Sequence, residues 1–166
     1  MTARPAPDPR ASVPPRVLLF GGAWLPIRDG DPRLIALYER HYSCNPRTTH
    51  EAHLRSGVSG VGESVCLMDW RCEAGFIWVR NTTPRMDGQI GPQCSFFRNE
   101  GDLRSSVLIR EADELAWSKW PDEPRHWTYV DSRKIKSSNP GYCFLMAGWR
   151  RCGVSKGGLT ILEVLR

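Results

Sequence analysis

Residues 93–119 read QCSFFRNEGDLRSSVLIREADELAWSK, and this stretch decides the fold class. Its start, residues 93–97, is largely apolar and aromatic, as expected for a strand, and a polar turn containing Gly101 follows. From Ser105 to Lys119 the apolar side chains recur at helical spacing on one face: Leu108, Ala112, Leu115 and Ala116. The charged side chains occupy the other face: Arg110, Glu111, Asp113 and Glu114. The stretch therefore predicts a strand, a glycine turn and an amphipathic helix.

The same alternation continues on both sides of this stretch. Upstream we expect a strand at 17–20, a helix at about 32–42 that Asp31 and Pro32 begin, a flexible loop at 45–62, and a hairpin of strands 63–68 and 75–80. Downstream we expect a strand at 126–131, a short helix that Asn139 and Pro140 open and Gly148 closes, and a last strand at 159–165. This order predicts an α/β fold, a single-domain mixed sheet with helices on both faces.

Length and composition fit one soluble domain. The chain has 166 residues, of which 40% are hydrophobic and 25% charged. Residues 1–15 contain five prolines and no hydrophobic period, which predicts a disordered leader before a domain at 16–166. Because no secretory signal and no apolar run of roughly 18 residues is present, we expect no membrane association and a cytoplasmic location, the host cytoplasm if a phage encodes the protein. The oligomeric state is left open.

The charge of the chain favours an anionic partner. The formal net charge is +5, and basic residues cluster at 133–136 and 150–156. Such clusters fit the phosphates of a nucleic acid, with an ordinary solvated surface as the alternative. The six cysteines show no paired spacing, and their positions relative to His41, His50 and His53 match no structural zinc pattern. We therefore expect reduced thiols and no metal site.

The turn after the strand at 93–97 is a candidate anion site. A helix N-terminus presents free backbone N–H groups, and Gly101 lets a phosphate approach them closely. Arg98 offers a charge-assisted hydrogen bond, while Ser105 and Ser106 either cap the helix or contact the phosphate. The alternative is an ordinary strand-to-helix turn that uses glycine for its backbone angles.

Arg98 and Gly101 also resemble the acetyl-CoA loop of the GNAT superfamily of acyltransferases, although Leu103 replaces the second small residue of that loop. Residues 139–149 resemble a later GNAT motif, in which Asn precedes a short helix that ends in Gly and an aromatic residue. The resemblance implies a GNAT-type fold and a donor such as acetyl-CoA or a related acyl compound. The residues that it implies for the donor are Arg98, Asn99, Gly101, Ser105, Ser106 and Asn139. Phe144 stands where many GNAT enzymes have a general-acid Tyr, and Tyr142 lies two residues earlier.

His41, Tyr42 and Ser43 are similar to an element of the Mom-type branch of this superfamily. Mom-type proteins attach a carbamoylmethyl group to N6 of adenine in phage DNA and thereby protect it from restriction. The resemblance implies DNA as a partner, an acyl donor and the same reaction here. We expect the reaction cleft to contain His41, Tyr42, Ser43, Arg98, Asp131 and Tyr142.

Chemistry at adenine N6 requires help, because the lone pair of this amine is delocalised into the ring. Asp131 is a candidate to accept its proton or hold the amine, and a base flipped out of a duplex needs an aromatic pocket. Four tryptophans are available for such a pocket: Trp70, Trp78, Trp127 and Trp149. The alternatives are a turn-forming Asp131, a packed Tyr42 and a packed His41. At the level of function, they are a GNAT N-acetyltransferase acting on a small-molecule or protein amine, and a non-catalytic DNA-binding module.

Overall fold

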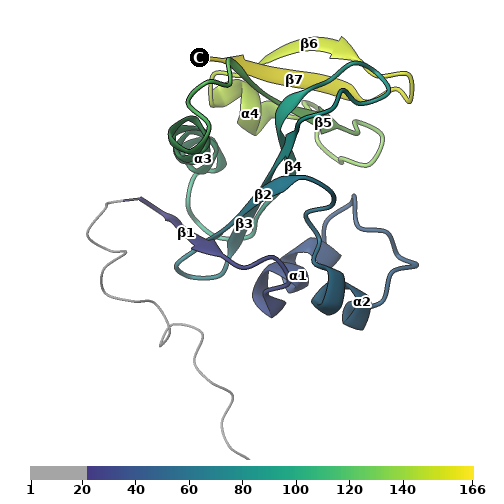
Figure 1. The fold of residues 1–166 in the computed structure, drawn as a ribbon, viewed down its shortest axis with the longest axis vertical. Coiled ribbons are helices and arrows are strands. Elements are labelled where there is room, and N and C mark those ends of the chain that lie inside the picture. Colours follow the sequence, from purple (N-terminus) through teal and green to yellow (C-terminus); the bar gives the residue numbers. More distant parts are fainter. Residues whose placement is uncertain (1–21) are drawn as a thin grey trace, which may run out of the picture.

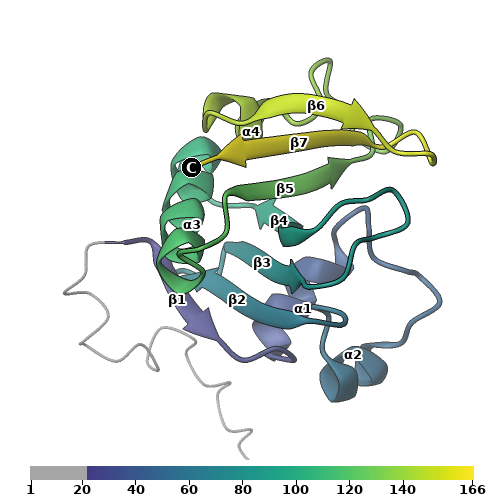
Figure 2. The ribbon, with the colours of Figure 1, turned by 45° about the horizontal axis from the view of Figure 1, so that its top comes forward.

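A mixed sheet of seven strands carries helices on both faces (Figures 1 and 2). The computed structural model describes residues 22–166, so the expected leader at 1–15 and strand at 17–20 lie outside the described residues. The strands are β1 (Trp24–Ile27), β2 (Glu63–Asp69), β3 (Ala74–Asn81), β4 (Gly91–Asn99), β5 (Arg125–Val130), β6 (Arg150–Val154) and β7 (Thr160–Leu165). The helices are α1 (Pro32–Glu39), α2 (His50–Ser56), α3 (Ser105–Lys119) and α4 (Tyr142–Met146). The α/β prediction with a mixed sheet is thus confirmed.

The sheet runs in the order β1-β2-β3-β4-β5-β7-β6. Every neighbouring pair is antiparallel except β4 and β5, which are parallel. The chain passes once from the first four strands to the last three, through α3. One hydrophobic cluster lies on the side of α3 and α4 and a second on the side of α1, so each face of the sheet has its own core.

Three elements differ from the sequence prediction. Helix α2 lies inside the expected loop at 45–62, where Thr49 caps it and the carboxylate of Glu39 accepts hydrogen bonds from His50 and His53. Strand β1 was missed because it has only four residues, and it is an edge strand that contains Pro26. Strand β6 was missed because all five of its residues are exposed, so no apolar alternation marks it.

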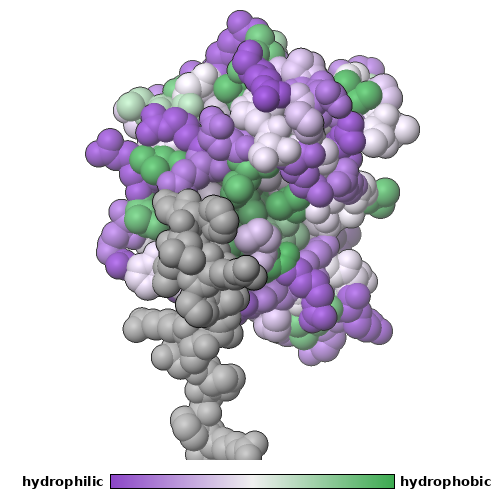
Figure 3. All heavy atoms as spheres, turned by 60° about the vertical axis from the view of Figure 1, so that its left-hand side comes forward, coloured by the Kyte–Doolittle hydropathy of each residue, from purple (hydrophilic) through white to green (hydrophobic). Residues whose placement is uncertain are grey.

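Helix α3 has the predicted bounds but a different buried face. The predicted apolar residue Leu115 is 42% exposed, whereas Asp113, predicted on the polar face, is buried. The buried positions instead follow Leu108, Ile109, Ala112, Asp113 and Ala116. Figure 3 brings the side of α3 and β1 forward and shows hydrophobic side chains gathered in the middle of a mostly polar face. No helix within residues 22–166 is long and apolar enough to cross a membrane.

Asp113 is buried because its carboxylate belongs to a polar network between α3 and the sheet. Its Oδ1 lies 2.8 Å from Nδ1 of His126, and its Oδ2 accepts a hydrogen bond of 2.8 Å from Nε1 of Trp149. The His126 ring is fully buried and stacks on Trp117, with a centroid separation of 3.4 Å. Within residues 22–166, Nε2 of His126 is the buried side-chain nitrogen or oxygen that has no hydrogen-bond partner.

Candidate functional site

A bulge in β4 separates it from β5 and opens the sheet. In the register with β3, Phe96 lies opposite Ile77 and Cys94 lies opposite Trp78, so Ser95 is the extra residue. Bulges bend a strand and change its twist. Strand β4 pairs with β5 at two positions alone among the described residues, Gln93 with Trp127 and Cys94 with Thr128. Beyond this point the two strands diverge.

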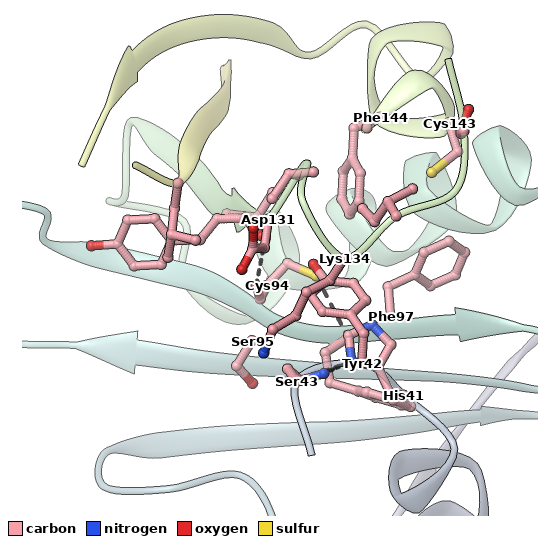
Figure 4. A pocket seen from close by; sticks show the side chains of 18 of the residues that line it. His41, Tyr42, Ser43, Cys94, Ser95, Phe97, Asp131, Lys134, Cys143 and Phe144 are labelled. Atoms are coloured by element: carbon pink, nitrogen blue, oxygen red, sulfur yellow. Dashed lines mark hydrogen bonds between the residues drawn. The ribbon is translucent and has the colours of Figure 1, made fainter. Parts of the chain in front are cut away.

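A cavity of about 540 Å³ occupies the space where β4 and β5 part (Figure 4). Its wall combines three phenylalanines, Phe96, Phe97 and Phe144, with the thiols of Cys94 and Cys143. Its polar residues come from four places along the chain: His41, Tyr42 and Ser43 after α1; Gln93 and Ser95 on β4; Thr128 and Tyr129 on β5; and Asp131, Lys134, Ser137, Asn139 and Tyr142 after β5. The volume and mixed lining are those of a small-ligand site.

His41 and Ser43 form a hydrogen-bonded pair at this cavity. The backbone N–H of Ser43 donates to Nδ1 of His41 over 3.2 Å, and the Ser43 hydroxyl lies 2.7 Å from the same nitrogen. Because Nδ1 accepts, the ring proton belongs on Nε2 and the hydroxyl donates to Nδ1. Burial and the nearby charge of Arg98 lower the pKa of His41 to about 4. His41 is therefore neutral at physiological pH, and the lone pairs of Ser43 Oγ remain available to a ligand.

Tyr42 meets Asp131 although 89 positions separate them in the sequence. Both residues line the cavity, and the backbone of Asp131 lies close enough to the Tyr42 hydroxyl to favour the ionised form of that hydroxyl. Burial is the main cause that raises the pKa of Tyr42, so its hydroxyl is protonated and can still donate to a ligand. The two residues thus line one cavity, whereas Arg98, expected in the same cleft, does not line it because it is turned to Glu100 and the Arg40 backbone.

The Asp131 carboxylate is held by its neighbour Arg133. Oδ1 accepts from Nε of Arg133 at 2.8 Å, Oδ2 from a terminal nitrogen at 3.1 Å, and Oδ1 also from the Arg133 backbone N–H at 3.1 Å. This pairing holds the pKa of Asp131 below its usual value. The carboxylate is consequently ionised and is a weak base, which suits holding an N–H group better than removing its proton.

The segment around α4 supplies the side of the cavity that belongs to the second part of the sheet. Asn139 lines the cavity, and its side-chain oxygen accepts from Arg151 at 2.8 Å. Tyr142 lies at the start of α4, half exposed, with its side chain lining the cavity. Phe144 packs between Phe97 and Trp149 and forms an apolar wall of the cavity.

Of the residues predicted to bind the donor, five lie between the end of β4 and the start of α3 and do not line the cavity: Arg98, Asn99, Gly101, Ser105 and Ser106. Asn139 lies after β5 and lines the cavity. Arg98 donates to Glu100 and to the backbone of Arg40, and the Gly101 N–H donates to the side chain of Asn99. Asn99 also donates to Ser105, and Ser106 is buried. The alternative that a serine caps α3 is wrong, because Arg104 is the N-cap residue and no side chain caps the helix.

Gly101 has a carboxylate beside it. A Cβ atom added to Gly101 would lie 2.6 Å from Oε2 of Glu73 and 2.9 Å from its Cβ. This glycine therefore accommodates Glu73. Whether the turn also holds a phosphate stays a prediction.

The tryptophans proposed for base stacking do not line the cavity. Trp78, Trp127 and Trp149 are buried in the core, and Trp70 lies at the turn after β2. The aromatic wall includes Phe96 and Phe97 instead, which the sequence did not single out because they lie on β4, a strand with an ordinary core pattern. Lys134 was noted as part of a basic cluster, but its place in the cavity was missed. No group of three His, Cys, Asp or Glu side chains within residues 22–166 is arranged to hold a metal ion.

The parted sheet and the cavity between β4 and β5 define an α/β domain with a ligand site at its centre. No protein-family model and no curated protein matches the chain. Among solved structures, the chain is similar to the GNAT domain of S. lividans PAT, with 18% identity, a TM-score of 0.59, and coverage of 86% of this chain and 89% of that one. A domain from Methanocaldococcus jannaschii aligns over 86% of this chain and 97% of its own, with 15% identity and a TM-score of 0.47. The chain thus has a GNAT-type fold.

Proposed function

We propose that this protein is a GNAT-type transferase that modifies the N6 amine of adenine in DNA, using an activated acyl donor. The observation that carries the proposal is the meeting of Tyr42 with Asp131 in one cavity. The short element 41–43, whose sequence resembles the Mom-type branch, thereby shares a cavity with Asp131, the candidate group for holding the amine.

The cavity offers distinct groups for a flipped adenine. The apolar faces of Phe96, Phe97 and Phe144 suit a base, which such enzymes take out of the stack before reaction. The ionised Asp131 is suited to accept a hydrogen bond from the N6 amine, and the Tyr42 hydroxyl to donate to a ring nitrogen. In this arrangement the carboxylate orients the amine and stabilises positive charge that develops on it, and the N6 proton passes to water as the new bond forms.

The donor chemistry differs from that of acetyltransferases that rely on a tyrosine acid. Phe144 has no proton to give to a departing thiolate, and Tyr142 is the cavity hydroxyl closest to it in sequence. A donor related to acetyl-CoA is compatible with the fold. Its leaving group then takes a proton from Tyr142 or water, or leaves as a stable anion.

The test is nucleoside mass analysis of DNA from cells that express the protein. A modified deoxyadenosine is expected with the natural chain and with Tyr38→Phe, which removes a hydroxyl outside the cavity. Tyr42→Phe is expected to abolish most of the product. Unmodified DNA, together with consumption of acetyl-CoA on a small or protein amine in the absence of DNA, would replace the proposal with an N-acetyltransferase. DNA binding without any product would leave a binding module.

A further inference from the structure

Few charged side chains line the cavity, and they differ in whether they form an ion pair. Among the lining side chains, those charged at neutral pH are Asp131 and Lys134, since the pKa of His41 is lowered to about 4. Asp131 is neutralised by its two-point contact with Arg133. Lys134 makes no ion pair with any residue of 22–166. The cavity therefore carries one uncompensated positive charge.

The position of Lys134 directs that charge inward. Its backbone N–H donates to the Asp131 carbonyl, which fixes the turn after β5. Figure 4 shows its side chain reaching from this turn into the cavity, in the direction of Ser95. Three serines line the same cavity. Ser43 and Ser95 already donate their hydroxyl hydrogens, to His41 and to the Ile77 carbonyl, whereas the Ser137 hydroxyl accepts a hydrogen bond and can still donate one. An ammonium group accompanied by a hydroxyl donor is the chemistry that holds a phosphate.

The arginines beside the turn after β4 are already engaged. Arg98 donates to Glu100 and to a backbone carbonyl, and Glu100 also pairs with Arg40. In the turn after β4, the Glu73 carboxylate lies beside Gly101. The positive charge of that turn is thus largely compensated, whereas the charge of Lys134 is not.

We propose that Lys134 binds a phosphate of the ligand in the cavity between β4 and β5. The inference rests on the proposed function for the identity of the ligand, a nucleotide of the target DNA. A phosphate of the acyl donor offers the same chemistry, and the experiment separates these two sources. In either case Lys134 determines which ligands enter, because it selects molecules that carry phosphate over uncharged molecules of the same shape.

The experiment compares the affinities of deoxyadenosine 5′-monophosphate and deoxyadenosine, which differ by the phosphate alone, by calorimetric or NMR titration without any donor. The natural protein is expected to prefer the monophosphate by about tenfold, the usual contribution of one charge-assisted hydrogen bond. Lys134→Ala should remove the preference and Lys134→Arg should retain it. Lys136→Ala is the matched control, since Lys136 lies two residues on and does not line the cavity.

A parallel titration with coenzyme A assigns the source. If Lys134→Ala weakens coenzyme A binding about tenfold but changes the affinity for neither deoxyadenosine 5′-monophosphate nor deoxyadenosine, the phosphate that Lys134 binds belongs to the donor. Equal effects of Lys134→Ala and Lys136→Ala on both ligands would overturn the inference, as would a natural protein that shows no preference for the monophosphate and whose coenzyme A binding is unchanged by Lys134→Ala. Because these are binding measurements, unmodified DNA in cells would refute the proposed function and leave this result standing.

Discussion

Nδ1 of His126 lies 2.8 Å from Oδ1 of Asp113, and both side chains are buried between α3 and the sheet. The second carboxylate oxygen of Asp113 binds Nε1 of Trp149, and Trp149 packs against Phe144 with a ring separation of 4.9 Å. Since Phe144 is part of the cavity wall, this polar network supports one side of the candidate site.

Asp113→Ala is expected to lower the free energy of unfolding by about 3 kcal/mol or more, because it leaves two buried donors without an acceptor. Asp113→Asn keeps one acceptor oxygen and should cost less. Denaturant titration measures both effects. The control is Glu114→Ala on the exposed side of the same helix, expected to change stability by less than about 0.5 kcal/mol. Equal costs for the substitutions at 113 and 114 would show that the network contributes nothing.

The lowered pKa of His41 makes stability depend on pH. The folded protein binds this proton only near pH 4, whereas the unfolded chain binds it near pH 6.5. Stability from this group is therefore fully present above pH 6.5 and is lost as the pH falls toward 4, with a slope of at most about 1.4 kcal/mol per pH unit. We expect His41→Gln to reduce the slope of the unfolding free energy between pH 4 and 6.5. Parallel curves for the two proteins would contradict the assignment.

Gly101→Val is expected to destabilise the protein by about 1 to 3 kcal/mol, because the new side chain overlaps Glu73. Glu73→Ala in the same chain should recover part of this loss, as the carboxylate is the nearest obstacle. Thermal unfolding of the natural chain, Gly101→Val and the doubly substituted protein checks both statements. If the doubly substituted protein folds and still binds coenzyme A as tightly as the natural chain, the donor loop is not at Gly101.

Tyr42→Phe and Asp131→Asn are each expected to lower adenine modification by about a hundredfold or more, the usual range for a positioned polar group. Their combined loss should be smaller than the product of the two, because the residues contact the same ligand and each other. The modification rates of the natural protein, the two single variants and the double variant are measured from DNA sampled over time. Tyr38→Phe should retain full activity. Strictly multiplicative losses would indicate that the two residues act at separate steps.

The sequence groups Arg150 and Arg151 as candidate phosphate contacts, but their side chains have different partners in the structure. Arg150 pairs with Glu163, while Arg151 reaches Asn139 at the edge of the cavity. Under the proposed function, Arg151→Ala should reduce the salt dependence of DNA binding by about one unit of log–log slope, with a smaller change for Arg150→Ala. Binding titrations at several salt concentrations measure this. An unchanged slope for both variants would assign them to the solvated surface.

The sequence was informative where a single pattern determines the structure. The hairpin of β2 and β3, the bounds of α3 and the Asp31 cap of α1 follow from alternation, helical period and capping chemistry. The predicted buried face of α3 was wrong at Asp113, because a carboxylate is expected on the surface unless its partners are known. Those partners, His126 and Trp149, come from β5 and from the turn between α4 and β6.

The candidate site was predictable only in part, for the same reason. The cleft of Tyr42 and Asp131 follows from a motif and a strand end, but its wall depends on the bulge at Ser95. A bulge is a mismatch in register between two strands, and neither strand shows it alone. The choice of phenylalanine over tryptophan for the wall, and the inward course of Lys134, likewise depend on three-dimensional packing.

The parting of β4 from β5 also couples ligand binding to folding. The segment that contains α3 is the covalent connection between residues 22–99 and residues 125–166, and β4 and β5 share two paired positions. A molecule in the cavity contacts side chains from both parts of the sheet and so acts as a noncovalent crosslink between them. Its binding free energy adds to the free energy of unfolding, which grows with the logarithm of ligand concentration. The natural ligand is therefore identifiable from the heat resistance it confers, even before its reaction is known.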